Sequence, residues 1–178
     1  MVDSLLKRNP KIHPQLDFPD YKSSILRAPK NKKISFSSTT TEISGPVFNK
    51  NKIGKLDNDL TLNFSKNNTL PVGHKIIVYG NLSDQFSNPI DGALIEIWQA
   101  NSAGKYLHHN DKNIAPIDPN FAGCGRSITS SKGYYEFITI QPGPYPYPNR
   151  GIEWRPMHIH FSVFGRSFGQ RLITQMYF

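Results

Sequence analysis

Short apolar segments and turn residues alternate along the second half of the chain. Strand-forming runs rich in Ile, Val, Tyr and Phe occupy residues 75–84, 93–98, 125–129, 134–140, 157–165 and 171–178. Segments rich in Gly, Asn, Asp, Ser or Pro separate most of them, for example 88–92 and 130–133. Short strands at this spacing are typical of antiparallel sandwiches and barrels. We therefore predict an all-β fold, an antiparallel β-sandwich.

The first part of the chain lacks this pattern. Prolines at positions 10, 14, 19, 29 and 46 interrupt any helix there. We expect residues 1–70 to form a long irregular N-terminal arm and residues 71–178 to form the β-sandwich domain. The sequence ends on the apolar run RLITQMYF. Because terminal segments are commonly polar and frayed, we also expect that a C-terminal part of the natural protein is missing.

Composition and charge exclude several classes of protein. Aromatic residues make up 12% of the 178 residues, which argues against disorder, and no apolar run approaches the roughly 18 residues that a membrane span needs. The net charge is +8, but the basic residues are scattered over the arm without a nucleic-acid-binding motif. One cysteine, Cys124, and a start without an apolar signal segment predict a cytoplasmic protein. We expect neither a nucleic-acid nor a membrane partner.

The clearest chemical motif is the segment MHIHFSV at residues 157–163. Side chains alternate between the two faces of a strand, so His158, His160 and Ser162 share one face while the apolar residues between them face the core. The two imidazoles, about 7 Å apart at Cα, can bind one metal ion. Two ordinary histidines on a polar face are the alternative interpretation.

Tyrosines are the other candidate ligands. No third histidine or carboxylate has obvious ligand spacing, so the triad of two histidines and one carboxylate is not evident. Tyr145 and Tyr147 lie in a proline-rich segment shortly before the histidines, and Tyr106 follows the run at 93–98. A phenolate ligand requires a metal acidic enough to remove its proton, and ferric iron suits this better than zinc. Each tyrosine taken singly could instead be a buried, hydrogen-bonded aromatic.

Longer motifs in a fixed order carry a resemblance to a known family. They are PDYKSSILRAPK (19–30), DNDLTLNF (57–64), LPVGHKIIVYG (70–80), ALIEIWQANSAGKYLH (93–108), APIDPNFAGCGR (115–126), GYYEF (133–137), TIQPGPYPYPN (139–149), WRPMHIHFS (154–162) and QRLITQMYF (170–178). From about residue 20 to residue 178 the chain resembles the intradiol ring-cleavage dioxygenases. Within that family it is most similar to the beta-type chains of the branch that cleaves protocatechuate.

The resemblance implies a cofactor and a reaction. Its four ligands of non-haem ferric iron would be Tyr106, Tyr145, His158 and His160. A catechol would chelate the iron and release one tyrosine, by analogy Tyr106, which then takes a substrate proton. Dioxygen would cleave protocatechuate between its two hydroxyl-bearing carbons, giving 3-carboxy-cis,cis-muconate.

Further residues gain roles through the same resemblance. Arg155 would place a cation beside the reacting carbon, where it stabilises developing negative charge, and Gln175 would help to position it. Tyr21 and Tyr147 would bind the substrate, and Tyr147 stands where related beta-type chains usually have Trp. Tyr177 is expected to pack rather than to take part in chemistry.

The resemblance also implies a partner and leaves two rival functions. The partner is a homologous alpha subunit in a hetero-oligomer, and the basic arm is a candidate for contact with it. One rival is an intradiol dioxygenase acting on catechol or hydroxyquinol, but residues 1–70 are too proline-broken for the helical linker domain of those enzymes. The other rival is a non-catalytic, transthyretin-like binding sandwich, which has no reason to hold two tyrosines and two histidines together.

Overall fold

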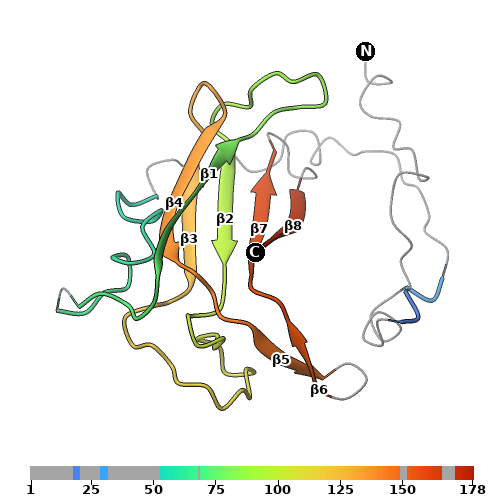
Figure 1. The fold of residues 1–178 in the computed structure, drawn as a ribbon. Helices are drawn as coiled ribbons and strands as arrows, with labels where there is room; N and C mark the ends of the chain where they lie inside the picture. Colours follow the sequence, from blue (N-terminus) through green and yellow to red (C-terminus); the bar gives the residue numbers. More distant parts are fainter. Residues whose placement is uncertain (1–17, 21–28, 32–52, 68, 149–151, 166–170) are drawn as a thin grey trace. The chain divides into compact units, whose positions relative to one another are not determined.

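The computed structural model describes residues 18–20, 29–31, 53–67, 69–148, 152–165 and 171–178 (Figure 1). Within these ranges the regular structure consists of β-strands, and there is no helix. The all-β prediction is therefore confirmed. Tyr21 and most of the predicted arm lie outside the described residues.

Contacts between residues divide the chain into two units. One consists of residues 1–37 and 147–153, and the other of residues 38–146 and 154–178. The second unit contains the two sheets that form the core. A boundary near residue 70 stays a prediction.

Eight strands make up the described regular structure. They are β1 (Lys75–Asn81), β2 (Leu94–Trp98), β3 (Cys124–Ile128), β4 (Tyr134–Ile140), β5 (Tyr145–Pro148), β6 (Ile152–Arg155), β7 (His158–Phe164) and β8 (Arg171–Tyr177). Six of them coincide with the apolar runs of the sequence. β5 lies in the proline-rich segment and, within the described residues, forms a two-stranded sheet with β6, so its prolines do not interrupt the interior of a larger sheet.

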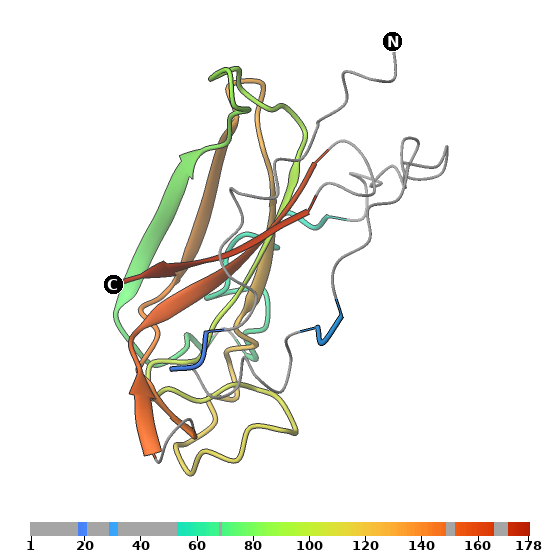
Figure 2. The ribbon, with the colours of Figure 1, turned by 90° about the vertical axis from the view of Figure 1, so that its right-hand side faces the viewer.

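Two of the sheets face each other. β1 pairs with β4, and a four-stranded sheet has the order β3-β2-β7-β8 with antiparallel neighbours. Figures 1 and 2 show the β1–β4 ribbon as a separate layer beside the four-stranded sheet. This arrangement is the predicted antiparallel sandwich.

The strand alternation builds the core between these layers. Ile97 of β2 and Phe161 of β7 are Cα partners, and both are buried against Phe137 of β4. The remaining members of the core cluster are Leu60, Val78, Ile95, Phe121, Ile140 and Ile159. The prediction that the apolar positions of β7 face the core is confirmed at Ile159 and Phe161.

The opposite face of the four-stranded sheet carries the polar residues of the motif. Strand register places Trp98 of β2 and Gln175 of β8 on either side of His160. The same register pairs His158 with Tyr177. The core that forms on one face of β7 therefore fixes which side chains meet on the other.

A core substitution tests this layering. Phe137 is fully buried, so Phe137→Ala should lower the free energy of unfolding by about 3–5 kcal/mol, measured by urea denaturation. Ile77→Ala on the paired strand β1 is the control, because Ile77 is 57% exposed and should change it by less than about 1 kcal/mol. Equal losses for the two variants would contradict the assignment of faces.

Candidate metal centre

The two histidines of β7 direct one nitrogen each toward the other. His158 Nε2 and His160 Nε2 are 3.2 Å apart. His158 Nδ1 lies 2.7 Å from the carbonyl oxygen of Pro156. Since a carbonyl can only accept a hydrogen bond, Nδ1 carries the proton and Nε2 presents a lone pair. This is how an outer hydrogen bond selects the tautomer of a metal-binding histidine.

Burial keeps both imidazoles neutral. It lowers the pKa of His160 to about 4, helped by the neighbouring His158 and Arg155. Burial also lowers the pKa of His158; the Pro156 hydrogen bond opposes this and Arg155 adds to it. Neutral imidazole is the form that binds a metal ion, so both rings are ready ligands at neutral pH.

Trp98 holds the ring of His160 in place. The indole and the imidazole are stacked with parallel planes and ring centroids 4.8 Å apart. The two residues are Cα partners on β2 and β7, so the stack follows from strand register. This role was not predicted from the sequence; its signal there is an aromatic residue at the end of the strand that pairs with the histidine strand.

Tyr145 at the start of β5 joins the two histidines. Its hydroxyl lies 3.3 Å from His158 Nε2, and the ring centroids of Tyr145 and His158 are 5.4 Å apart. Because Nε2 carries no proton, the hydroxyl donates to it. A phenol oxygen thus lies next to one of the two imidazole nitrogens that approach each other.

Tyr106 completes the group from the loop after β2. Its ring meets Tyr145 edge-on, with centroids 5.4 Å apart, and lies 6.5 Å from the ring of His160. The hydroxyl is buried, and among the described residues it has no hydrogen-bond partner. Burial, followed by the nearby phenol of Tyr145, raises the pKa of Tyr106 well above its ordinary value.

This donor set fits a strongly acidic cation. A buried phenol oxygen without a hydrogen-bond partner among the described residues is costly unless a bound ligand compensates it. Phenol oxygens also require a metal that can displace their protons. Elsewhere in the described part, no group of three or more His, Cys, Asp and Glu side chains could hold a metal ion. The structure brings together the four residues to which the resemblance assigned the role of iron ligands.

Arg155 lies beside this group and is held from β8. Its Nη2 donates to Gln175 Oε1 at 2.7 Å and to Tyr177 Oη at 2.9 Å, and Tyr177 Oη donates to the same oxygen of Gln175 at 2.9 Å. The contact that the predicted role of Gln175 requires is present. Tyr177, which was expected only to pack, also holds the arginine.

The two predicted substrate residues are less defined. Tyr147 is half-buried in β5, two residues after Tyr145, and its contact with a substrate stays a prediction. Tyr21 lies outside the described residues. Neither adds to the geometry of the group formed by Tyr106, Tyr145, His158 and His160, which we call the Tyr–His cluster.

Comparison with known proteins assigns the family. Residues 43–178 match the family model described as "Dioxygenase", and residues 6–39 match that described as "Protocatechuate 3,4-dioxygenase beta subunit N terminal". The chain belongs to the intradiol dioxygenase family. Enzymes of this family use non-haem iron, which agrees with the donor set of the Tyr–His cluster.

Individual relatives support the family assignment. A protocatechuate 3,4-dioxygenase beta chain from Burkholderia cepacia is 47% identical over 93% of this chain and 70% of its own length. A catechol 1,2-dioxygenase from Candida albicans is 34% identical over 61% of this chain and 38% of its own length. The structure of 3-chlorocatechol 1,2-dioxygenase from Rhodococcus opacus 1CP matches with a TM-score of 0.55 and 26% identity. That match covers 76% of this chain and 54% of the other, so the chain spans only part of each relative.

The described residues form no helix that is long and apolar enough to cross a membrane.

Two glycines let the tyrosine-bearing segments approach each other. A Cβ on Gly143 would lie 2.4 Å from the carbonyl oxygen of Ser102 and 2.6 Å from the amide nitrogen of Gly104. Gly104 has φ near +77°, and its own Cβ would meet the carbonyl oxygen of Pro144 at 2.1 Å. The loop carrying Tyr106 and the segment carrying Tyr145 are therefore in backbone contact.

A methyl group at Gly143 should separate these segments. Gly143→Ala adds a Cβ against rigid backbone, so we expect the free energy of unfolding to fall by about 1–3 kcal/mol in chemical denaturation. Gly54→Ala is the control, since its Cβ would meet chiefly the Asp57 carboxylate oxygen at 3.0 Å, which can move. An unchanged stability of Gly143→Ala would show that the approach is looser than described.

Proposed function

We propose that this chain is the iron-binding subunit of a protocatechuate 3,4-dioxygenase. The observation that carries the proposal is the Tyr–His cluster: two imidazole nitrogens 3.2 Å apart, a phenol oxygen 3.3 Å from one of them, and a second, buried phenol without a described partner. The substrate is taken from the 47% identical beta chain, whose name specifies protocatechuate.

Each residue of the cluster has a defined task in this proposal. His158 and His160 supply neutral Nε2 donors, and Tyr106 and Tyr145 supply phenolate oxygens after losing their protons. Two phenolates offset most of the charge of a trivalent cation and so reduce the cost of burying it. Bound ferric iron would supply the Lewis acidity that prepares a catechol for reaction with dioxygen.

Proton transfer is assigned to a tyrosine. A catechol brings two acidic hydroxyls, and a phenolate displaced by it can accept one proton at Oη. By analogy with the family this residue is Tyr106, whose pKa is raised by burial, so its phenolate is a stronger base than a phenolate exposed to water.

Arg155 is assigned to stabilise negative charge on the reacting substrate. Gln175 and Tyr177 fix its guanidinium through one nitrogen, Nη2, so the charge is oriented before the substrate arrives. A preorganised cation of this kind contributes more in the transition state than in the ground state.

The remaining contacts concern the substrate and a partner. We assign Tyr21 and Tyr147 to the substrate pocket and propose that a homologous alpha subunit contacts the N-terminal arm. The match of residues 6–39 to a beta-subunit N-terminal family supports that partner. Action on catechol is the second candidate, favoured by the 34% identical catechol 1,2-dioxygenase.

Spectroscopy and oxygen uptake together test the function. The iron-loaded chain, alone and co-expressed with an alpha subunit, should show a visible phenolate-to-iron charge-transfer band and should consume oxygen with protocatechuate faster than with catechol. Tyr106→Phe and Tyr145→Phe should each weaken the band. A colourless protein with bound iron would refute the ligand assignment, whereas faster uptake with catechol would select the second candidate.

Replacing Arg155 tests the charge assignment. Arg155→Ala should retain the charge-transfer band but lower kcat by roughly 10²–10³, the scale seen when a preorganised charge stabiliser is removed. Arg126→Ala is the matched control, because Arg126 on β3 is a half-exposed arginine paired with Glu96 at 3.2 Å. Equal turnover of the two variants would exclude the role proposed for Arg155.

A further inference from the structure

The position of Tyr106 is not determined by its own hydroxyl. That hydroxyl makes no hydrogen bond to any described residue, and its ring contacts other aromatic rings of the Tyr–His cluster. A side chain that must present one oxygen to a metal therefore needs another source of order. The loop that carries it, residues 101–113, contains that source.

The carboxylate of Asp111 holds the two residues at the centre of this loop. Its Oδ2 accepts a hydrogen bond from the Tyr106 amide at 2.8 Å, and its Oδ1 lies 3.4 Å from Lys105 Nζ. Oδ1 also accepts the Asn113 amide at 2.7 Å. One carboxylate thus links the backbone amide of Tyr106 to the side-chain ammonium of Lys105.

Lys105 is a buried cation with an unusual set of acceptors. It is 8% exposed, and besides the carboxylate its Nζ donates to the backbone carbonyls of Asp111 at 3.0 Å and Asn113 at 2.5 Å. A buried ammonium is tolerated only when its donors are satisfied in this way. Burial acts to raise the pKa of Asp111, but the Tyr106 and Asn113 amides and Lys105 outweigh it and hold the pKa below its usual value.

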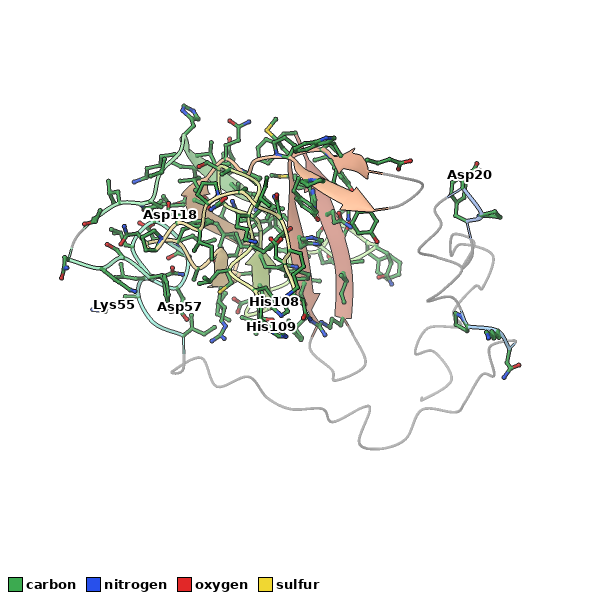
Figure 3. The ribbon with its side chains drawn as sticks, turned by 90° about the horizontal axis from the view of Figure 1, so that it is seen from below. Asp20, Lys55, Asp57, His108, His109 and Asp118 are labelled. Atoms are coloured by element: carbon green, nitrogen blue, oxygen red, sulfur yellow. The ribbon has the colours of Figure 1, made fainter. Side chains whose placement is uncertain are left out.

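The start of the loop is hydrogen-bonded to the backbone of Lys105 as well. Asn101 Oδ1 accepts the amides of Ala103 and Lys105, both at 2.9 Å, and the Asn101 amide donates to the Lys105 carbonyl at 2.8 Å. Asn113 Nδ2 donates to the Gly104 carbonyl at 3.0 Å. Figure 3 shows His108 and His109 of this loop beside one another, and both are exposed.

We propose that the Lys105–Asp111 pair is a positioning device that sets the backbone of Tyr106, and so the direction of its phenol oxygen, before a metal is bound. This inference rests on the proposed function, because it assumes that Tyr106 is a metal ligand. Asp111 and Lys105 touch neither substrate nor metal in it; they act through Tyr106.

The test follows the Tyr106 amide and the phenolate signal separately. In the metal-free full chain labelled with ¹⁵N-tyrosine, Asp111→Ala should speed hydrogen exchange of the Tyr106 amide about tenfold, the factor that corresponds to losing one charge-assisted hydrogen bond. In the iron-loaded chain it should shift the resonance Raman bands of the bound phenolates. Asp111→Asn keeps an acceptor oxygen and should restore most of both properties.

Asp118→Ala is the matched control. Asp118 is 8% exposed, and like Asp111 it accepts two backbone amides, those of Val72 and Asn120, at 2.7 and 2.9 Å. It should cost thermal stability without changing Tyr106 exchange or the phenolate bands. If Asp118→Ala changes both signals as much as Asp111→Ala does, the role of Asp111 is merely structural and the proposal is overturned.

Two further outcomes separate this proposal from the proposed function. If Asp111→Ala does not fold, Asp111→Asn and Lys105→Met carry the test, and unchanged exchange and unchanged bands in Lys105→Met overturn the assignment to the pair. If the wild-type chain binds iron without any phenolate band, the proposed function fails. Faster exchange of the Tyr106 amide in metal-free Asp111→Ala would then still support the backbone role of Asp111.

Discussion

Successive side chains of a β-strand point to opposite faces of its sheet, and in β7 the side chains on each face have their own set of contacts. Ile159 and Phe161 are locked into the sandwich core, so His158 and His160 must project together on the other side. Slipping the register by one residue would exchange the two sets and bury imidazoles in the core. Three features depend on this one register. They are the stack of Trp98 on His160, the contacts of Gln175 and Tyr177 with Arg155, and the close approach of the two Nε2 atoms.

The Tyr–His cluster lowers the stability of the folded chain when no ligand is bound. The buried phenol of Tyr106, which has no described hydrogen-bond partner, leaves hydrogen-bonding capacity unused, and a group of this kind typically costs about 1–3 kcal/mol. The core packs apolar side chains closely, whereas the Tyr–His cluster leaves a buried polar group without a described partner. A local exception of this kind is the usual sign of a site shaped for a ligand. The surrounding sandwich and the hydrogen-bonded loop after β2 supply the stability that offsets this.

Local sequence pattern was sufficient for the parts of the molecule that local physics controls. The strand runs and the two faces of β7 follow from the alternation of side chains within a few residues. Alternation along the strand already made His158 and His160 candidate ligands, but selecting Tyr106 and Tyr145 among the nearby tyrosines required the resemblance. β6, the second role of Tyr177 and the Asp111 contacts were missed because they depend on strand pairing and loop closure, which no short motif encodes. Tyr21 lies beyond what the described ranges can address.

The parallel stack of Trp98 on His160 makes the metal centre visible by emission. The chain has two tryptophans, and the other, Trp154, is 65% exposed. An indole in van der Waals contact with a ligand ring transfers its excitation to a coloured metal complex, while a solvent-facing indole emits at longer wavelength. Titrating iron into the apo-chain should therefore quench the blue part of the tryptophan spectrum first. The ring that keeps His160 in place thus also serves as a built-in gauge of metal occupancy.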